Sequence, residues 1–128
     1  MRTLITDDAD AAVAGIADGS TILIGGFGMA GMPVTLIDAL IRQGATDLTV
    51  VNNNAGNGDT GLAALLAAGR VKKIICSFPR QADSHHFDRL YRAGRFPDLC
   101  HLNLANRCSE IPHYPREPVR VGVMWAER

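Results

Sequence analysis

The chain has 128 residues, no formal net charge and 47% hydrophobic residues, which is typical of one globular domain. Its thirteen basic residues balance thirteen acidic ones, and no basic stripe predicts nucleic-acid binding. The apolar runs are too short to span a membrane, and the first residues lack the pattern of a signal peptide. Three cysteines cannot all pair with one another. We therefore expect a cytoplasmic protein that binds neither nucleic acid nor membrane.

Hydrophobic periodicity predicts helices that alternate with short buried strands. The first helix covers 6–16, with Thr6 or Asp7 as its N-cap, and a later helix begins at Pro33 and ends before Gly44. The other predicted elements are helices over 62–68 and 83–92 and strands over 21–24, 48–51 and 71–76. The segment 119–125 is either one more strand or a loosely packed tail.

This alternation predicts an α/β fold, with an open, mostly parallel sheet and flanking helices. The runs 21–24 and 48–51 are continuous rather than alternating, so we expect both faces of the sheet to be covered, although Lys72 and Lys73 break the apolarity of the third strand. In such sheets ligands bind beyond the carboxyl ends of the strands. Three loops should meet there: 25–31, 52–58 and 77–81.

A glycine-rich loop follows the first strand. Glycines without a Cβ allow backbone N–H groups to approach a ligand, and a helix that starts directly afterwards adds unpaired N–H donors. This pattern favours an anionic or carbonyl-like ligand. The residues that we expect to form this binding loop are Gly25, Gly26, Phe27, Gly28, Gly31 and Pro33.

Other interpretations of this loop are open. Residues 26–31 fit the G-x-G-x-x-G pattern of dinucleotide-binding domains, but asparagines stand where such domains place an acidic residue after the second strand. No Gly-Lys-Ser/Thr follows, which excludes a P-loop. A tight strand-to-helix turn without any ligand is the remaining alternative.

The loop and its surroundings resemble the A subunit of family I CoA-transferases. The resemblance rests on Asp18-Gly19, Gly25-Gly26-Phe27, Gly31 with Pro33, and the later segments 47–51, 53–57 and 72–74. Residues 76–81 and 87–94 look most like the 3-oxoadipate (β-ketoadipate) branch. The succinyl-CoA:acetoacetate branch is the alternative. The resemblance covers about 3–94 and implies the CoA-transferase fold.

The resemblance implies an enzyme that moves CoA from succinyl-CoA to a 3-oxoacid, most simply 3-oxoadipate, in the β-ketoadipate pathway of aromatic-compound catabolism. It implies that CoA and succinyl-CoA are substrates and that no cofactor is permanently bound. The family's nucleophile is a glutamate in a Ser-Glu-Asn-Gly motif of the B subunit, which attacks the thioester. The nearest match here, Ser109-Glu110-Ile111-Pro112, lacks that motif. We therefore assign no catalytic residue and expect a CoA-transferase B subunit as partner, in a heterotetramer of two A and two B subunits.

Several polar residues are candidates for the substrate pocket. Asn52, Asn53 and Asn54 either orient a polar substrate or bond to the backbone of their own turn. Arg80 either pairs with the distal carboxylate of a dicarboxylic oxoacid or is a solvated loop arginine. Phe27 either forms a wall of the pocket or packs in the core beneath the loop.

Beyond residue 94 the sequence departs from the family. His101 stands nearest to a family glutamine that donates to the oxyanion, and Leu102 occupies a glycine position. We therefore divide the chain into residues 1–94, the N-terminal part of an A-subunit domain, and a divergent C-terminal segment, 95–128, which leaves the fold incomplete. A non-catalytic remnant that binds a partner or CoA is the alternative function.

We expect no metal site. Cys100, His101, Cys108 and His113 lack a recognised zinc spacing. His85 and His86 are adjacent on a predicted helix and should therefore point apart.

Overall fold

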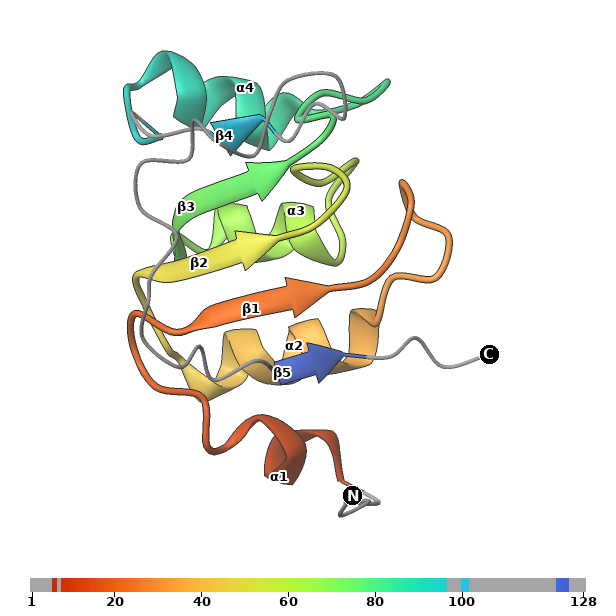
Figure 1. The fold of residues 1–128 in the computed structure, drawn as a ribbon, viewed down its shortest axis with the longest axis vertical. Coiled ribbons are helices and arrows are strands. Elements are labelled where there is room, and N and C mark those ends of the chain that lie inside the picture. Colours follow the sequence, from red (N-terminus) through yellow and green to blue (C-terminus); the bar gives the residue numbers. More distant parts are fainter. Residues whose placement is uncertain (1–5, 7, 97–99, 102–121, 125–128) are drawn as a thin grey trace.

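A computed structural model describes residues 6, 8–96, 100–101 and 122–124 of the chain. Within these residues the strands form a parallel sheet in the order β4-β3-β2-β1-β5 (Figure 1). The strands are β1 (Thr21–Ile24), β2 (Leu48–Val51), β3 (Val71–Cys76), β4 (Cys100–His101) and β5 (Gly122–Met124). The first three match the predicted strands, and β5 confirms the strand interpretation of 119–125 for its three described residues.

The described part of the chain holds the helices α1 (Ala9–Val13), α2 (Val34–Gln43), α3 (Leu62–Ala67) and α4 (His85–Arg92). Helix α1 precedes β1, and the other three each follow a strand. Helix α1 is shorter than predicted, and its N-cap is neither Thr6 nor Asp7. The cap is Asp8, whose carboxylate accepts a hydrogen bond of 3.0 Å from the Asp10 amide. Gly44 ends α2 in the left-handed region, as the sequence predicts.

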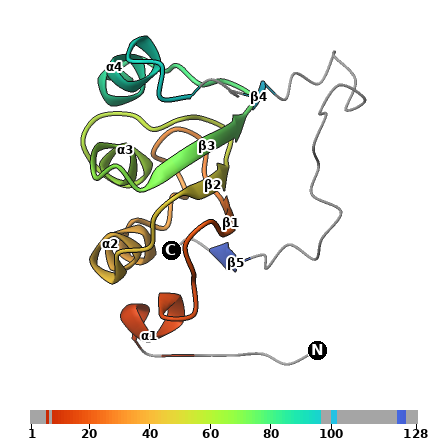
Figure 2. The same cartoon turned by 90° about the vertical axis from the view of Figure 1, so that its left-hand side faces the viewer.

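The helices lie on one side of the sheet (Figure 2). Alternate strand residues such as Ile22, Val50 and Ile74 are buried beneath them, and together with helix residues they form the core. The residues between them face the other way and are less buried, and Leu23 is 38% exposed. The expectation that both faces are covered is therefore wrong for the described part of the chain. A short apolar run does not show whether a strand is covered on one face or on both.

Helix α4 packs through aromatic rings. Phe87 is 2% exposed, and its ring stacks on that of Phe96 with centroids 6.0 Å apart. This packing fixes the end of the β3–α4 connection, from which candidate site residues project. Among the described residues, no helix is long and apolar enough to cross a membrane.

Candidate functional site

The three predicted loops meet at the carboxyl edge of the sheet, where β1, β2 and β3 end (Figure 1). The side-chain amide of Asn52 donates to the carbonyl oxygens of Ile24 and Gly25, at 2.6 and 3.2 Å, and thereby joins the second loop to the first. The amides of Ser77 and Phe78 donate to the Asn53 carbonyl, at 3.2 and 2.9 Å, and join the third loop to the second. The topology thus brings together three segments that lie far apart in the sequence.

The glycine loop is a tight hairpin. The Phe27 amide donates to the Ala30 carbonyl at 2.9 Å, and the Ala30 amide donates back to Phe27 at 3.1 Å. Gly26, Gly28 and Gly31 have positive φ angles of 118°, 62° and 71°, which favour glycine. Their amides make no hydrogen bond within the described part of the chain. The amides of Phe27 and Ala30 are therefore used within the loop, while those of Gly26, Gly28 and Gly31 have no partner among the described residues.

The end of the glycine loop leads directly into α2. Pro33 is the N-cap and not the first helical residue, because its ψ of 71° is not helical and α2 begins at Val34. No side chain caps this end of α2. The first-turn N–H donors and the positive end of the helix dipole thus lie beside the loop without a side-chain partner.

Phe27 lies at the tip of the hairpin and is 71% exposed. The alternative that it packs in the core is therefore wrong. Met29 is also exposed, whereas Met32 is buried, and its sulfur accepts a hydrogen bond of 3.3 Å from the Leu62 amide. The glycine loop therefore has a buried base and an apolar, solvent-facing tip.

The asparagines after β2 bond mainly to backbone. The Asn52 Oδ1 accepts from the Asn54 amide at 2.9 Å, and the Asn54 Oδ1 accepts from the Gly56 amide at 2.8 Å. Both side chains are buried. The Asn53 Oδ1 and the Asn54 Nδ2 are buried without a hydrogen-bond partner. Asn52 therefore holds the loops together, while Asn53 and Asn54 each keep one buried polar atom without a hydrogen-bond partner.

Arg80 is engaged with α4. Its Nε donates to the Asp88 carboxylate at 2.6 Å, and its guanidinium lies 5.8 Å from the centroid of the Tyr91 ring. The hydrogen bond to Asp88 raises the pKa of Arg80. A substrate carboxylate would have to compete with Asp88 for this guanidinium. Gln81 lies closer to the glycine loop, and its Oε1 is 3.1 Å from where a Cβ on Gly28 would stand.

His101 lies in β4, which pairs in parallel with β3 so that His101 is level with Cys76. This register places it at the carboxyl edge with the three loops. Other candidates, namely Leu102, Cys108, Ser109–Pro112 and His113, lie outside the described residues.

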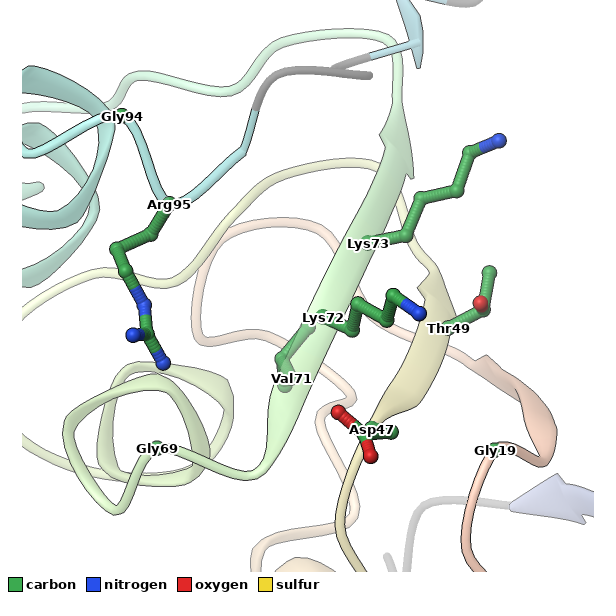
Figure 3. Close-up of a pocket in the computed structure, with 9 residues that line it drawn as sticks. All are labelled: Gly19, Asp47, Thr49, Gly69, Val71, Lys72, Lys73, Gly94 and Arg95. Carbon is green, nitrogen blue, oxygen red and sulfur yellow. The ribbon is translucent and has the colours of Figure 1, made fainter.

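A cavity of about 640 Å³ lies at the other end of the strands, away from the glycine loop (Figure 3). It is lined by Gly19, Asp47, Thr49, Gly69, Val71, Lys72, Lys73, Gly94 and Arg95. Figure 3 shows Arg95 extending toward the turn at Gly69 and Lys73 pointing away from it. Since ligands of open parallel sheets bind at the carboxyl edge, we assign the site to the loops and not to this hollow.

The structure brings Asp59, His85 and His86 together in a cluster that the sequence did not predict. His85 and His86 do not point apart, because both rings contact Asp59 and their centroids are 4.1 Å apart. The hydrogen bond with Asp83 raises the pKa of His85, and the hydrogen bond with His86 lowers the pKa of Asp59. The adjacent histidines were a visible signal, but nothing in the spacing of Asp59 indicated that it lies between them.

Residues 6–103 match the family model described as Coenzyme A transferase. The chain belongs to the coenzyme A transferase family. The match runs past residue 94, so the division of the chain at that position stays a prediction.

Two relatives are highly similar in sequence. The chain is 69% identical over 84 residues to the A subunit of 3-oxoadipate CoA-transferase from Pseudomonas putida, a match that covers 66% of this chain and 36% of that protein. It is 49% identical over 78 residues to the A subunit of succinyl-CoA:3-ketoacid coenzyme A transferase from Helicobacter pylori, a match that covers 61% of this chain and 33% of that protein. The chain thus spans about a third of the length of these curated relatives.

The solved structures agree with the fold. Glutaconate coenzyme A-transferase from Acidaminococcus fermentans matches with a TM-score of 0.58 and 30% identity, over 69% of this chain and 28% of that one. A variant of the decarboxylase AibA/AibB also matches, with a TM-score of 0.58 and 25% identity, over 73% of this chain and 36% of that one. The α/β fold with a parallel sheet is therefore confirmed as a CoA-transferase fold.

Proposed function

We propose that this chain supplies the A-subunit part of a CoA-transferase that moves CoA from succinyl-CoA to a 3-oxoacid, and that the oxoacid is 3-oxoadipate. The 69% identity to the Pseudomonas putida protein carries the choice of oxoacid, since the succinyl-CoA:3-ketoacid relative is 49% identical. The acetoacetate-type enzyme is the second candidate function. Its support is the similarity to that second relative.

The geometry supports a binding and stabilising role for the glycine loop. The unbonded amides of Gly26, Gly28 and Gly31, beside the uncapped start of α2, can donate to a carboxylate or a thioester oxygen. Such fixed donors stabilise the negative charge that develops on a carbonyl oxygen during acyl transfer. Gly25, Phe27 and Pro33 complete the loop, and Asn53 and His101 are the neighbouring candidates for substrate contact, whereas the fully buried Asn54 supports the second loop.

The nucleophilic glutamate in this proposal comes from a separate B subunit, with its Ser-Glu-Asn-Gly motif. CoA and succinyl-CoA act as substrates, and no permanently bound cofactor is needed. The heterotetramer, the β-ketoadipate pathway of aromatic-compound catabolism and the cytoplasmic location belong to the same proposal. Their support is the sequence resemblance.

The test is co-expression with a matching B subunit, followed by measurement of 3-oxoadipyl-CoA formation from succinyl-CoA and 3-oxoadipate. Acetoacetate as the acceptor distinguishes the two branches. Replacement of the motif glutamate of the B subunit by glutamine is the control and should abolish turnover. A formed complex without turnover on either acceptor would reject the catalytic proposal and favour a remnant that only binds a partner or CoA.

A further inference from the structure

Asp59, His85 and His86 place three potential metal-ligating atoms within 4.8 Å of one another. The Nε2 atoms of His85 and His86 lie 3.1 and 2.8 Å from the same oxygen, Oδ1 of Asp59. Ligand atoms about 2.0–2.1 Å from a tetrahedral zinc ion lie about 3.3 Å apart, so these two distances need to grow by only a few tenths of an ångström. Two of the three spacings are therefore already close to those of a metal site, and the third lies within 4.8 Å.

The fold holds the two parts of this cluster together. Asp59 follows the second loop, and the histidines open α4, 26 and 27 residues later. The Gly58 amide donates to the Asp83 carbonyl at 2.8 Å, and the Asp83 amide donates to the Asn57 side chain at 2.9 Å. These backbone links lie next to the cluster and do not involve its ligating atoms. They hold the segment that carries Asp59 next to the start of α4 without using a ligating atom.

We propose that Asp59, His85 and His86 form a binding site for a divalent transition-metal ion of the zinc type. Two imidazoles and one carboxylate suit Zn²⁺ and its neighbours in the first transition row, whereas Mg²⁺ and Ca²⁺ prefer oxygen ligands alone. The inference does not depend on the transferase activity proposed above.

Asp83 supports this assignment from outside the ligand set. Its Oδ1 lies 2.8 Å from the Nδ1 of His85 and can accept the proton there, which leaves Nε2 for a metal. The Nδ1 of His86 is buried without a hydrogen-bond partner. A metal on Nε2 leaves the proton on that Nδ1 without an acceptor, which lowers the affinity of the site. We therefore expect binding weaker than that of a closed structural zinc site.

The exposure of the cluster leaves room for further ligands. The side chains of Asp59 and His85 are 77% and 48% exposed, while that of His86 is 20% exposed. Water can therefore complete the coordination on the outer side. The bound ion would tie the second loop to the start of α4 and close a long segment of chain, which stabilises the folded state.

The test uses the untagged full chain and titrates it with Co²⁺ and then with Zn²⁺ as a competitor. We expect one Co²⁺ per chain, visible d–d absorption without a thiolate charge-transfer band, and a higher melting temperature with Zn²⁺. Asp59→Asn and His86→Ala should weaken Co²⁺ binding by about 100-fold or more, and Asp83→Asn by about 10-fold, because Asp83 only orients His85. Asp38→Asn, at an exposed position of α2, is the matched control and should leave Co²⁺ binding unchanged.

Asp59→Asn keeps the test decisive if His86→Ala fails to fold, because Asp59 is exposed; circular dichroism of each variant before titration verifies folding. The proposal is overturned if Asp59→Asn binds Co²⁺ as tightly as the parent chain. A thiolate band, which would place the ion on cysteine, or no saturation below about 1 mM metal would overturn it equally.

Discussion

The glycine loop and the pair of loops beside it are held in different ways. The second loop is bonded to the third through the Asn53 carbonyl, and to the start of α4 through hydrogen bonds from Gly58 to Asp83 at 2.8 Å and from the Ser84 hydroxyl to the Gly56 carbonyl at 3.1 Å. The glycine loop bonds mainly to itself, through Phe27 and Ala30, and is anchored at its base by Asn52. One region is therefore a rigid support, and the other is a tip with spare N–H donors and exposed apolar side chains.

Of the loop substitutions, Gly56→Ala in the rigid support should lower the free energy of unfolding most. Gly56 has a φ of 96°, and a Cβ there would lie 2.6 Å from the Ala63 amide nitrogen and 2.8 Å from its Cα. Because these are backbone atoms of α3, the strain cannot be relieved by a side-chain movement. We expect a loss of about 3 kcal/mol or more in the free energy of unfolding, measured by urea denaturation.

Gly58→Ala is the matched control, because its φ is 66° and no atom lies within 4 Å of the Cβ position. It should lose only about 1 kcal/mol, the cost of a left-handed alanine. Equal losses in the two variants would show that the close packing of the second loop on α3 contributes nothing.

Asn52→Ala should cause an intermediate loss of stability, because it removes the hydrogen bonds that join the second loop to the glycine loop. The Asn52 side chain donates to Ile24 and Gly25 and accepts from the Asn54 amide, and it is only 6% exposed. Its removal leaves buried backbone groups unpaired, so we expect a loss of about 2–3 kcal/mol by the same denaturation measurement.

Asn53→Ala is the control for Asn52→Ala, because the Asn53 Oδ1 makes no hydrogen bond. We expect a loss of less than about 1 kcal/mol. A larger loss for Asn53→Ala than for Asn52→Ala would contradict the assignment of Asn52 as the link between the loops.

The sequence predicts the supporting framework better than the contacts of the site. Buried runs such as 21–24 and 71–76, and helix ends such as Gly44, are local signals, and the structure confirms them. The meeting of three loops at one edge follows from parallel topology alone. The framework was therefore predictable because each of its signals lies within a few residues of chain.

The details that were missed depend on segments far apart in the sequence. Arg80 pairs with Asp88 on the next helix, and Asp59 lies between two histidines 26 and 27 residues away. Among the described residues the helices pack on one face of the sheet and Leu23 on the other face is 38% exposed, which is likewise set by tertiary arrangement. No local sequence pattern indicates which distant side chains will contact one another.

The smallest effect on stability should come from Phe27→Ala at the tip of the glycine loop. Because Phe27 is 71% exposed, its ring gives up little buried area, and we expect a change of less than about 0.5 kcal/mol. Phe87→Ala is the matched control in the same chain, since Phe87 is 2% exposed and stacks on Phe96; it should lose about 3–5 kcal/mol. A substantial loss for Phe27→Ala would mean that the tip packs against the rest of the chain. Unchanged stability would show that the phenyl ring is not needed for folding. Any loss of turnover by Phe27→Ala in the complex with the B subunit would then reflect a lost contact with a ligand or partner.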